Sequence, residues 1–131
     1  MPPIIHIEPN AEAVAQSAAV FIADRITTVL KKQDRFCLAL SGGSTPKRLH
    51  EILAESPYKE QIDWSRLHIF WGDERYVPLE DERNNARMAY DTLLNHVVVP
   101  EDQIHIMRTD YPDPKESATE YEQLLHQYFD G

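Results

Sequence analysis

The segment Phe36-Cys37-Leu38-Ala39-Leu40-Ser41-Gly42-Gly43-Ser44-Thr45-Pro46 decides the fold of this chain. The apolar run 36–40 is too short for an independent helix and ends at a glycine pair, so it predicts a strand of a parallel sheet that is buried on both faces. The glycines predict a tight turn. Thr45 and Pro46 then predict a helix start, with the threonine hydroxyl as the cap and proline at the first helical position.

A strand, a glycine turn and a helix start in direct succession can hold an anion. Glycines let the backbone approach a ligand closely, and the free N–H groups at a helix start favour a phosphate or an oxyanion. An ordinary strand-to-helix turn has the same residue pattern, and segment 41–46 is neither a Walker loop nor a G-x-G-x-x-G fingerprint. The turn alone therefore leaves both a binding role and a purely structural role open.

Strands and helices are predicted to alternate along the rest of the chain. Apolar residues spaced three and four apart predict helices over 11–30, from Thr45 to about 56, from Asn84 or Asn85 to 94, and from 114 to the last residue, with Asn10 and Asp113 as caps. Short apolar runs predict strands at 4–7, 67–71 and 104–107. This order predicts an α/β fold with a mainly parallel sheet flanked by helices on both faces.

The composition argues against several classes of partner. A formal net charge of −9 opposes binding to nucleic acid and to acidic lipid surfaces. We expect no run long enough to cross a membrane and no signal peptide at the start of the chain. The single cysteine, Cys37, lies in an apolar run, as is typical of a buried thiol in a reducing compartment. We therefore expect a cytoplasmic chain, and we expect no metal site because no Cys or His cluster has ligand spacing.

A second loop, 72–85, follows the predicted strand 67–71 and is dense in charged residues. Because ligands of such sheets bind outside the carboxyl ends of the strands, this loop and the glycine turn are expected to line one crevice. The planar fork of Arg75 suits a phosphate, although a salt bridge to Asp73 or to the acids at 80–82 is an alternative. Asp73 and Glu74 can orient a sugar hydroxyl, take part in proton transfer or only fix the loop.

Other charged and titratable residues give weaker signals. Four further cations either add positive potential near the crevice or are solvated charges on helices, namely Lys47, Arg48, Arg83 and Arg87. Histidine is the usual general base. None of the six histidines follows a glycine-rich turn at the end of a predicted strand, so none of them is expected to act as the base.

Taken in order, the motifs 40–46, 71–78 and Arg83-Asn84 resemble those of the 6-phosphogluconolactonase family over nearly the whole chain. The resemblance implies hydrolysis of 6-phosphogluconolactone to 6-phosphogluconate in the oxidative pentose phosphate pathway. It implies no cofactor and a small sugar-phosphate lactone as the ligand. It also implies a set of substrate-binding residues, with Arg75 on the phosphate side: Gly42, Gly43, Ser44, Thr45, Asp73, Glu74 and Arg75.

The chain departs from the family in one respect. Family members are much longer, and their general base is a histidine of a later Asp-Gly-His motif that this sequence does not contain. The resemblance thus implies that residues 1–131 are the N-terminal part of a single lactonase-like domain, with the substrate-binding loops but without the base. We expect the chain alone to be inactive, or nearly so, as a lactonase, and the sequence predicts no oligomeric state.

Two rival hypotheses remain at this point. A glucosamine-6-phosphate deaminase-type enzyme also uses a Gly-Ser-Thr-Pro turn, but its second motif resembles Leu-Asp-Glu-Tyr, whereas Arg75 here directly follows Asp73 and Glu74. A non-catalytic module that binds a sugar phosphate is consistent with the missing base.

Overall fold

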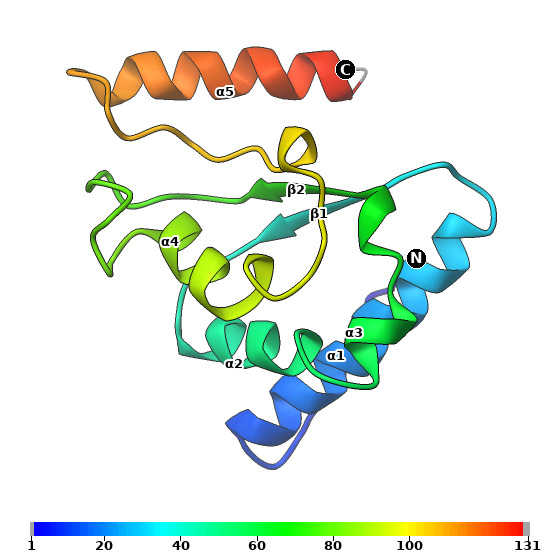
Figure 1. Cartoon of the computed structure of the whole chain (residues 1–131). Coiled ribbons are helices and arrows are strands. Elements are labelled where there is room, and N and C mark those ends of the chain that lie inside the picture. The colour runs from blue at the N-terminus through cyan, green and yellow to red at the C-terminus, as the bar shows by residue number, and fades with distance from the viewer. Residues whose placement is uncertain (1, 130–131) are drawn as a thin grey trace.

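A computed structural model provides the structure of the protein and describes residues 2–129. The elements follow one another as α1 (Ala11–Leu30), β1 (Phe36–Leu40), α2 (Ser44–Leu53), α3 (Tyr58–Gln61), the 3₁₀ turn η1 (Trp64–Arg66), β2 (Leu67–Trp71), α4 (Asn85–Ala89), the π-helical η2 (Tyr90–Leu94), the 3₁₀ turn η3 (Glu101–Gln103) and α5 (Pro114–Tyr128). The alternation confirms the α/β class. Figure 1 shows α5 on one side of the sheet and α1, α2 and α4 on the other.

The sheet consists of β1 and β2, which run parallel with Phe36 beside Leu67. Among the described residues only Ile104 pairs on the far side of β2, in a parallel bridge to Ile69, so the prediction of a strand over 104–107 is wrong. The physical reason lies in α5. Its Tyr121 hydroxyl accepts from Trp71 N at 3.0 Å and donates to His105 O at 2.8 Å, and so replaces the ladder bonds of a longer strand.

The predicted strand over 4–7 is also wrong, because this segment is extended but pairs with no other strand among the described residues. The helix ends differ slightly from expectation as well. α2 ends at Leu53, short of the cis Ser56-Pro57 bond, and α5 ends at Tyr128. The expected continuation of α5 to the last residue falls partly on 130–131, which lie outside the described residues.

β1 is buried on one face only, which corrects the expectation of burial on both. Its residues Phe36, Leu38 and Leu40 face the core, whereas Ala39 on the opposite face is exposed. α5 covers this opposite face over β2, where the Tyr128 ring lies 5.2 Å from the Phe70 ring. The cover does not extend over Ala39.

Helix α1 begins at the predicted cap, since Asn10 Oδ1 accepts from Ala13 N at 2.8 Å. It packs into the core through Ala15, Ala19, Ala23 and Ile26. Val14 and Phe21, which belong to the apolar residues whose spacing predicts this helix, are 40% and 62% exposed. α1 is also long and apolar enough, at 20 residues and a mean hydropathy of 1.3, to span a membrane by length and composition alone. This finding corrects the expectation that no segment reaches that length.

His50 of α2 makes the stability of the fold depend on pH. It is 1% exposed, and burial lowers its pKa from 6.5 to about 4. The unfolded chain therefore binds a proton more readily than the native chain, so stability is complete above pH 6.5 and falls as the pH decreases. At pH 5 this histidine alone is expected to cost about 2 kcal/mol. Burial lowers the pKa of His68 and of His105 as well, which adds to the same trend.

Urea denaturation at pH 7.5, 6 and 5 checks this expectation. His50→Gln is expected to flatten the dependence of unfolding free energy on pH, whereas His126→Gln, a change at an exposed histidine of α5, is the matched control and should leave it unchanged. Equal slopes for the His50→Gln variant and the parent chain would contradict the assignment.

Candidate functional site

The glycine turn and the charged loop start side by side at the carboxyl ends of β1 and β2. Gly72 N donates to Leu40 O at 3.0 Å, so the parallel ladder continues one residue beyond β2. Both segments then leave the same edge of the sheet, as the sequence predicts (Figure 1). Residues 42–45 and 73–75, which contain all seven predicted site residues, therefore share this edge.

The turn presents the start of α2 without a side-chain cap. Helix α2 begins at Ser44, and its N-cap is Gly43 with a φ of 107°, a left-handed conformation that favours glycine. The prediction of Thr45 as the cap is therefore wrong, because the positive φ of Gly43 starts the helix two residues earlier, at Ser44 instead of Pro46. Ser44 and Thr45 are exposed in the first turn, and no side chain of residues 2–129 caps the N–H groups there.

Asn85, the first residue of α4, joins the turn to the loop. Its side-chain Nδ2 donates to Asp73 O at 3.2 Å and to Asp73 Oδ1 at 3.4 Å. The same amide group packs against Gly42 so closely that a Cβ on Gly42 would overlap Asn85 Oδ1 and lie 2.6 Å from Asn85 Cγ. Asn85 is 6% exposed. This buried side chain thus holds Asp73 beside Gly42.

Glu74 has a structural role that the sequence left as one of three options. Its Oε1 accepts from Arg75 N at 2.8 Å and from Asn85 N at 2.6 Å, and its Oε2 accepts from Ala86 N at 2.9 Å. A carboxylate at a helix start also interacts favourably with the helix dipole. Glu74 therefore fastens the loop to the beginning of α4.

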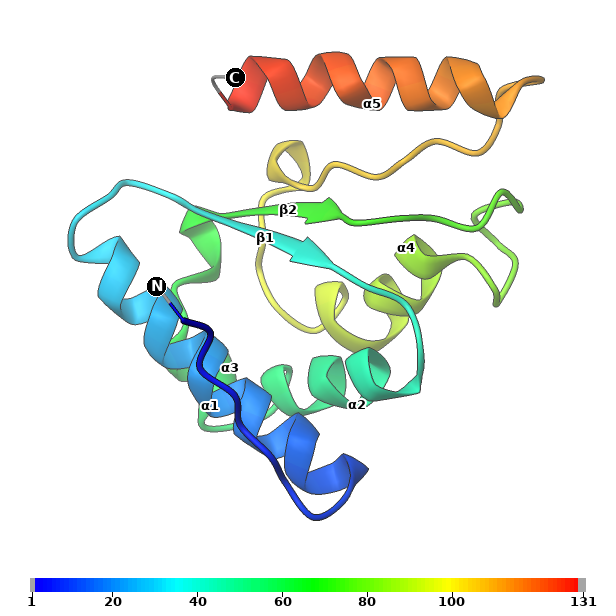
Figure 2. The ribbon, with the colours of Figure 1, turned by 180° about the vertical axis from the view of Figure 1, so that it is seen from behind.

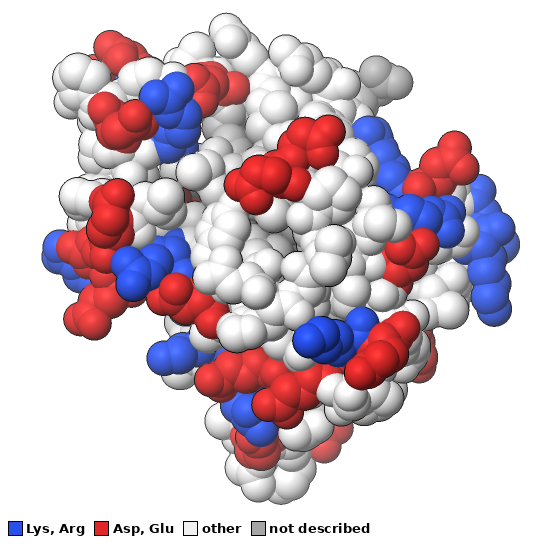
Figure 3. All heavy atoms as spheres, viewed as in Figure 1, with Lys and Arg blue, Asp and Glu red and all other residues white. Residues whose placement is uncertain are grey.

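Arg75 is exposed, and within residues 2–129 its guanidinium forms no salt bridge, so the alternative of a bridge to Asp73 or to the acids at 80–82 is not found. Other arginines near this edge are paired: Arg48 with Glu12, Arg83 with Asp81, Arg87 with Asp91 and Arg108 with Asp110. The guanidinium of Arg83 holds the pKa of Asp81 at about 2. On the face in Figure 3, blue and red residues also stand mostly next to each other.

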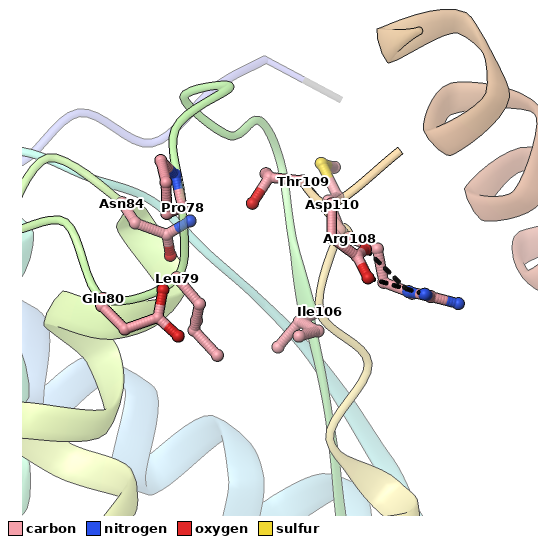
Figure 4. A pocket seen from close by; sticks show the side chains of 9 residues that line it. Pro78, Leu79, Glu80, Asn84, Ile106, Arg108, Thr109 and Asp110 are labelled. Atoms are coloured by element: carbon pink, nitrogen blue, oxygen red, sulfur yellow. Dashed lines mark hydrogen bonds and ion pairs between the residues drawn. The ribbon is translucent and has the colours of Figure 1, made fainter. Parts of the chain in front are cut away.

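A cavity of about 360 Å³ lies beside the loop, between 78–84 and the segment that follows Ile104 (Figure 4). It is lined by Pro78, Leu79, Glu80, Asn84 and 106–110. A neighbouring cavity of about 370 Å³ lies against α5 and includes Glu74 and Tyr76. The role of segment 106–110 in lining this cavity could not be predicted, because the apolar run 104–107 has the sequence pattern of a strand although it pairs through Ile104 alone among the described residues. Within residues 2–129 no His, Cys, Asp and Glu side chains gather as a metal-binding group.

The sequence offers Asn84 and Asn85 as alternative helix starts, and Asn84 also belongs to the Arg83-Asn84 motif. Asn84 is the cap, since its Oδ1 accepts from Arg87 N at 2.9 Å. A helix start needs one capping asparagine, so the second asparagine in the sequence was the only sign that Asn85 has a different role.

Comparisons with known proteins show which family the chain resembles. The pattern of the family described as "Glucosamine-6-phosphate isomerases/6-phosphogluconolactonase" matches residues 9–131. A 6-phosphogluconolactonase of Synechocystis sp. is 38% identical over 129 residues, which are 98% of this chain and 52% of that protein. One of Mycobacterium leprae is 36% identical over 95% of this chain and 51% of its own length.

Solved structures show the same relationship. The 6-phosphogluconolactonase of Thermotoga maritima has a TM-score of 0.85 at 27% identity and covers 97% of this chain and 55% of its own. The 6-phosphogluconolactonase of Trypanosoma brucei has a TM-score of 0.82 at 25% identity, and the match covers 96% of this chain and 51% of that one. The chain spans about half the length of the relatives it matches.

Proposed function

Since the chain belongs to the glucosamine-6-phosphate isomerase/6-phosphogluconolactonase family, we propose that its carboxyl edge binds a phosphorylated sugar lactone and serves the hydrolysis of 6-phosphogluconolactone to 6-phosphogluconate. The observation that carries this proposal is the meeting of the glycine turn and the Asp73–Arg75 loop across Asn85. Residues 1–131 are then the N-terminal part of a single lactonase-like domain.

In this proposal each loop holds a different part of the substrate. Arg75, whose guanidinium forms no salt bridge within the described part of this chain of net charge −9, donates two hydrogen bonds to the phosphate. The N–H groups of Ser44 and Thr45 lie at the uncapped start of α2. They are placed to stabilise the oxyanion that forms when water attacks the ester carbonyl carbon. The carbonyl group re-forms as the ring C–O bond breaks, and the proton lost by the attacking water passes to the leaving alkoxide. The product is the open-chain hydroxy acid. Asp73, held by Asn85, orients a sugar hydroxyl.

Arg75→Ala is expected to weaken the binding of 6-phosphogluconate by roughly tenfold to a hundredfold, because hydrogen bonds to charged groups contribute about 1.5–3 kcal/mol. Isothermal titration calorimetry measures the change. Arg83→Ala is the matched control, since Arg83 is already paired with Asp81, and it should bind as the parent does. Gluconate, which lacks the phosphate, should bind the parent and the Arg75→Ala variant equally weakly. Unchanged affinity in the Arg75→Ala variant would remove Arg75 from the phosphate site.

The chain by itself is expected to hydrolyse the lactone at least a hundredfold more slowly than the Synechocystis relative, because a positioned general base typically contributes about 10²–10⁴-fold. Three histidines that are buried or packed against other rings are not expected to replace this base. His50 is 1% exposed, and the rings of His68 and His105 make edge contacts with the Tyr128 ring, with centroid separations of 5.6 and 4.8 Å. A pH-stat assay of both proteins measures the ratio.

A rate from the chain close to that of the relative would show that a base is present after all. Release of ammonia from glucosamine 6-phosphate without lactone hydrolysis would favour the deaminase hypothesis instead.

A further inference from the structure

Arg75 has a fixed backbone, whereas its guanidinium forms no salt bridge within residues 2–129. Its N–H donates to Glu74 Oε1 and its carbonyl accepts from Val77 N, both at 2.8 Å. The second bond closes a three-residue turn centred on Tyr76. Because no residue of 2–129 other than glycine has a positive φ, this is an inverse γ-turn. In so short a turn, a displacement of Tyr76 moves Arg75 with it.

Tyr76 ties this turn to the layer of α5. Its hydroxyl donates a hydrogen bond to the carbonyl of Tyr111, in the segment that leads into α5. On the other side, Glu74 binds the loop to the start of α4, and Val77 O accepts from Asn84 Nδ2 at 3.3 Å. Figure 2 shows the loop after β2 between these two layers, with α5 above it and α4 below it. The loop is thus anchored on both sides.

The carbonyl that accepts from Tyr76 is itself held in place. The guanidinium of Arg108 lies 4.6 Å from the centre of the Tyr111 ring and donates to the Tyr111 hydroxyl at 3.1 Å. That hydroxyl donates to Glu120 of α5, and Arg108 O accepts from the hydroxyl of Ser117, which is 7% exposed in the same helix. Segment 108–111 is therefore fastened to α5, and a hydrogen bond to Tyr111 O is a bond to a fixed point.

We propose that Tyr76 is a positioning residue for the phosphate site: through its bond to Tyr111 O, its hydroxyl holds Arg75 where the guanidinium meets the phosphate. Tyr76 lies outside the seven substrate-binding residues that the family resemblance implies, and it acts through Arg75 without touching the ligand. This inference rests on the proposed function, in which Arg75 binds the phosphate. The physical reason is preorganisation, because a side chain that must be ordered on binding lowers the affinity.

Tyr76→Phe tests this role, because phenylalanine keeps the ring and loses only the donor. In isothermal titration calorimetry we expect the variant to bind 6-phosphogluconate about threefold to tenfold more weakly than the parent chain, with the weak binding of gluconate unchanged. In the Arg75→Ala background the same change should have no further effect on affinity. Tyr90→Phe is the matched control, since it removes a hydroxyl that donates to Glu101 at 3.0 Å, and it should bind as the parent does.

A second measurement follows the loop without any ligand. Backbone amide NMR relaxation reports motion on the ps–ns timescale. Order parameters of residues 75–77 should be lower in the Tyr76→Phe variant than in the parent chain, whereas those of α4 should not change. Because Tyr76 is 41% exposed, the variant should keep the melting temperature of the parent. A loss of affinity without a loss of stability separates positioning from a general structural role.

Unchanged affinity of the Tyr76→Phe variant, in a chain whose Arg75→Ala variant binds more weakly, would overturn the positioning role alone. Equal losses of affinity with and without Arg75 would overturn it too, since Tyr76 would then act independently of the guanidinium. Unchanged order parameters at 75–77 would show that the hydroxyl does not hold the loop. A parent chain that does not bind 6-phosphogluconate would overturn the proposed function and, with it, this role of Tyr76.

Discussion

Gly42→Ala is expected to destabilise the protein by about 3 kcal/mol, because inserting a methyl group into a well-packed site costs about 1–3 kcal/mol and more where nothing can yield. The added Cβ would overlap Asn85 Oδ1 and lie 2.6 Å from Asn85 Cγ. Asn85 cannot move aside without losing its bonds to Asp73, and it is only 6% exposed. The collision therefore separates the two loops as well as weakening the fold. Thermal unfolding should show a fall in melting temperature of roughly 10 °C.

A double variant distinguishes this collision from a general intolerance of the turn. Gly42→Ala combined with Asn85→Ala should be no less stable than Asn85→Ala alone, because the obstructing amide is gone. Gly72→Ala is the matched control. A Cβ there would lie 3.9 Å from Leu40 O, an ordinary contact, so its cost should stay below about 1 kcal/mol. Gly42→Ala with the parent melting temperature would show that Asn85 does not hold the turn.

Glu74→Ala is expected to cost about 3 kcal/mol, because removing a helix-capping acceptor costs about 1–2 kcal/mol and this carboxylate accepts from three N–H groups. Two of those donors, Asn85 N and Ala86 N, belong to residues that are 6% and 0% exposed. Without the carboxylate, these donors are left without an acceptor at the start of α4. We also expect weaker binding of 6-phosphogluconate, since the loop that carries Arg75 is released.

Glu74→Gln separates charge from hydrogen bonding. A glutamine has one acceptor oxygen, so it can accept either from Arg75 N and Asn85 N or from Ala86 N, but not from all three. We therefore expect an intermediate loss of stability. Glu82→Ala changes an exposed acid of the same loop and is the control. Chemical denaturation of the three variants gives the order Glu74→Ala, Glu74→Gln, Glu82→Ala from least to most stable. An equal stability for all three would show that Glu74 does not fasten the loop.

The local sequence pattern was sufficient to predict those elements whose formation depends on neighbouring residues. The strand 36–40, the turn after it, the strand 67–71 and the cap at Asn10 agree with the structure within a residue or so. Periodicity did not show which part of an apolar stripe is buried, because Val14 and Phe21 of α1 face away from the core that Ala15 and Ala19 enter. Burial depends on what packs against a helix.

The candidate site could likewise be predicted in part from the sequence. The presence of a glycine turn and of Asp73, Glu74 and Arg75 at the ends of two strands is readable from the sequence. The sequence does not show which of the charged side chains are free to bind a ligand, because ion pairs form between residues that folding brings together, as Arg48 with Glu12 shows. The replacement of a third strand by the Tyr121 hydroxyl is likewise a contact across about 50 residues of chain.

The sequence by itself determined the α/β class, the two strands and the family, because these follow from local conformational preferences and from motifs in a set order. Only the tertiary structure decided that Asn85 locks Gly42 to Asp73 and that Glu74 is engaged in holding α4. It also decided that, within residues 2–129, the Arg75 guanidinium forms no salt bridge and one edge of β1 pairs with no strand. Each of these outcomes is a competition for partners among residues far apart in the chain, and folding brings those competitors within reach of one another.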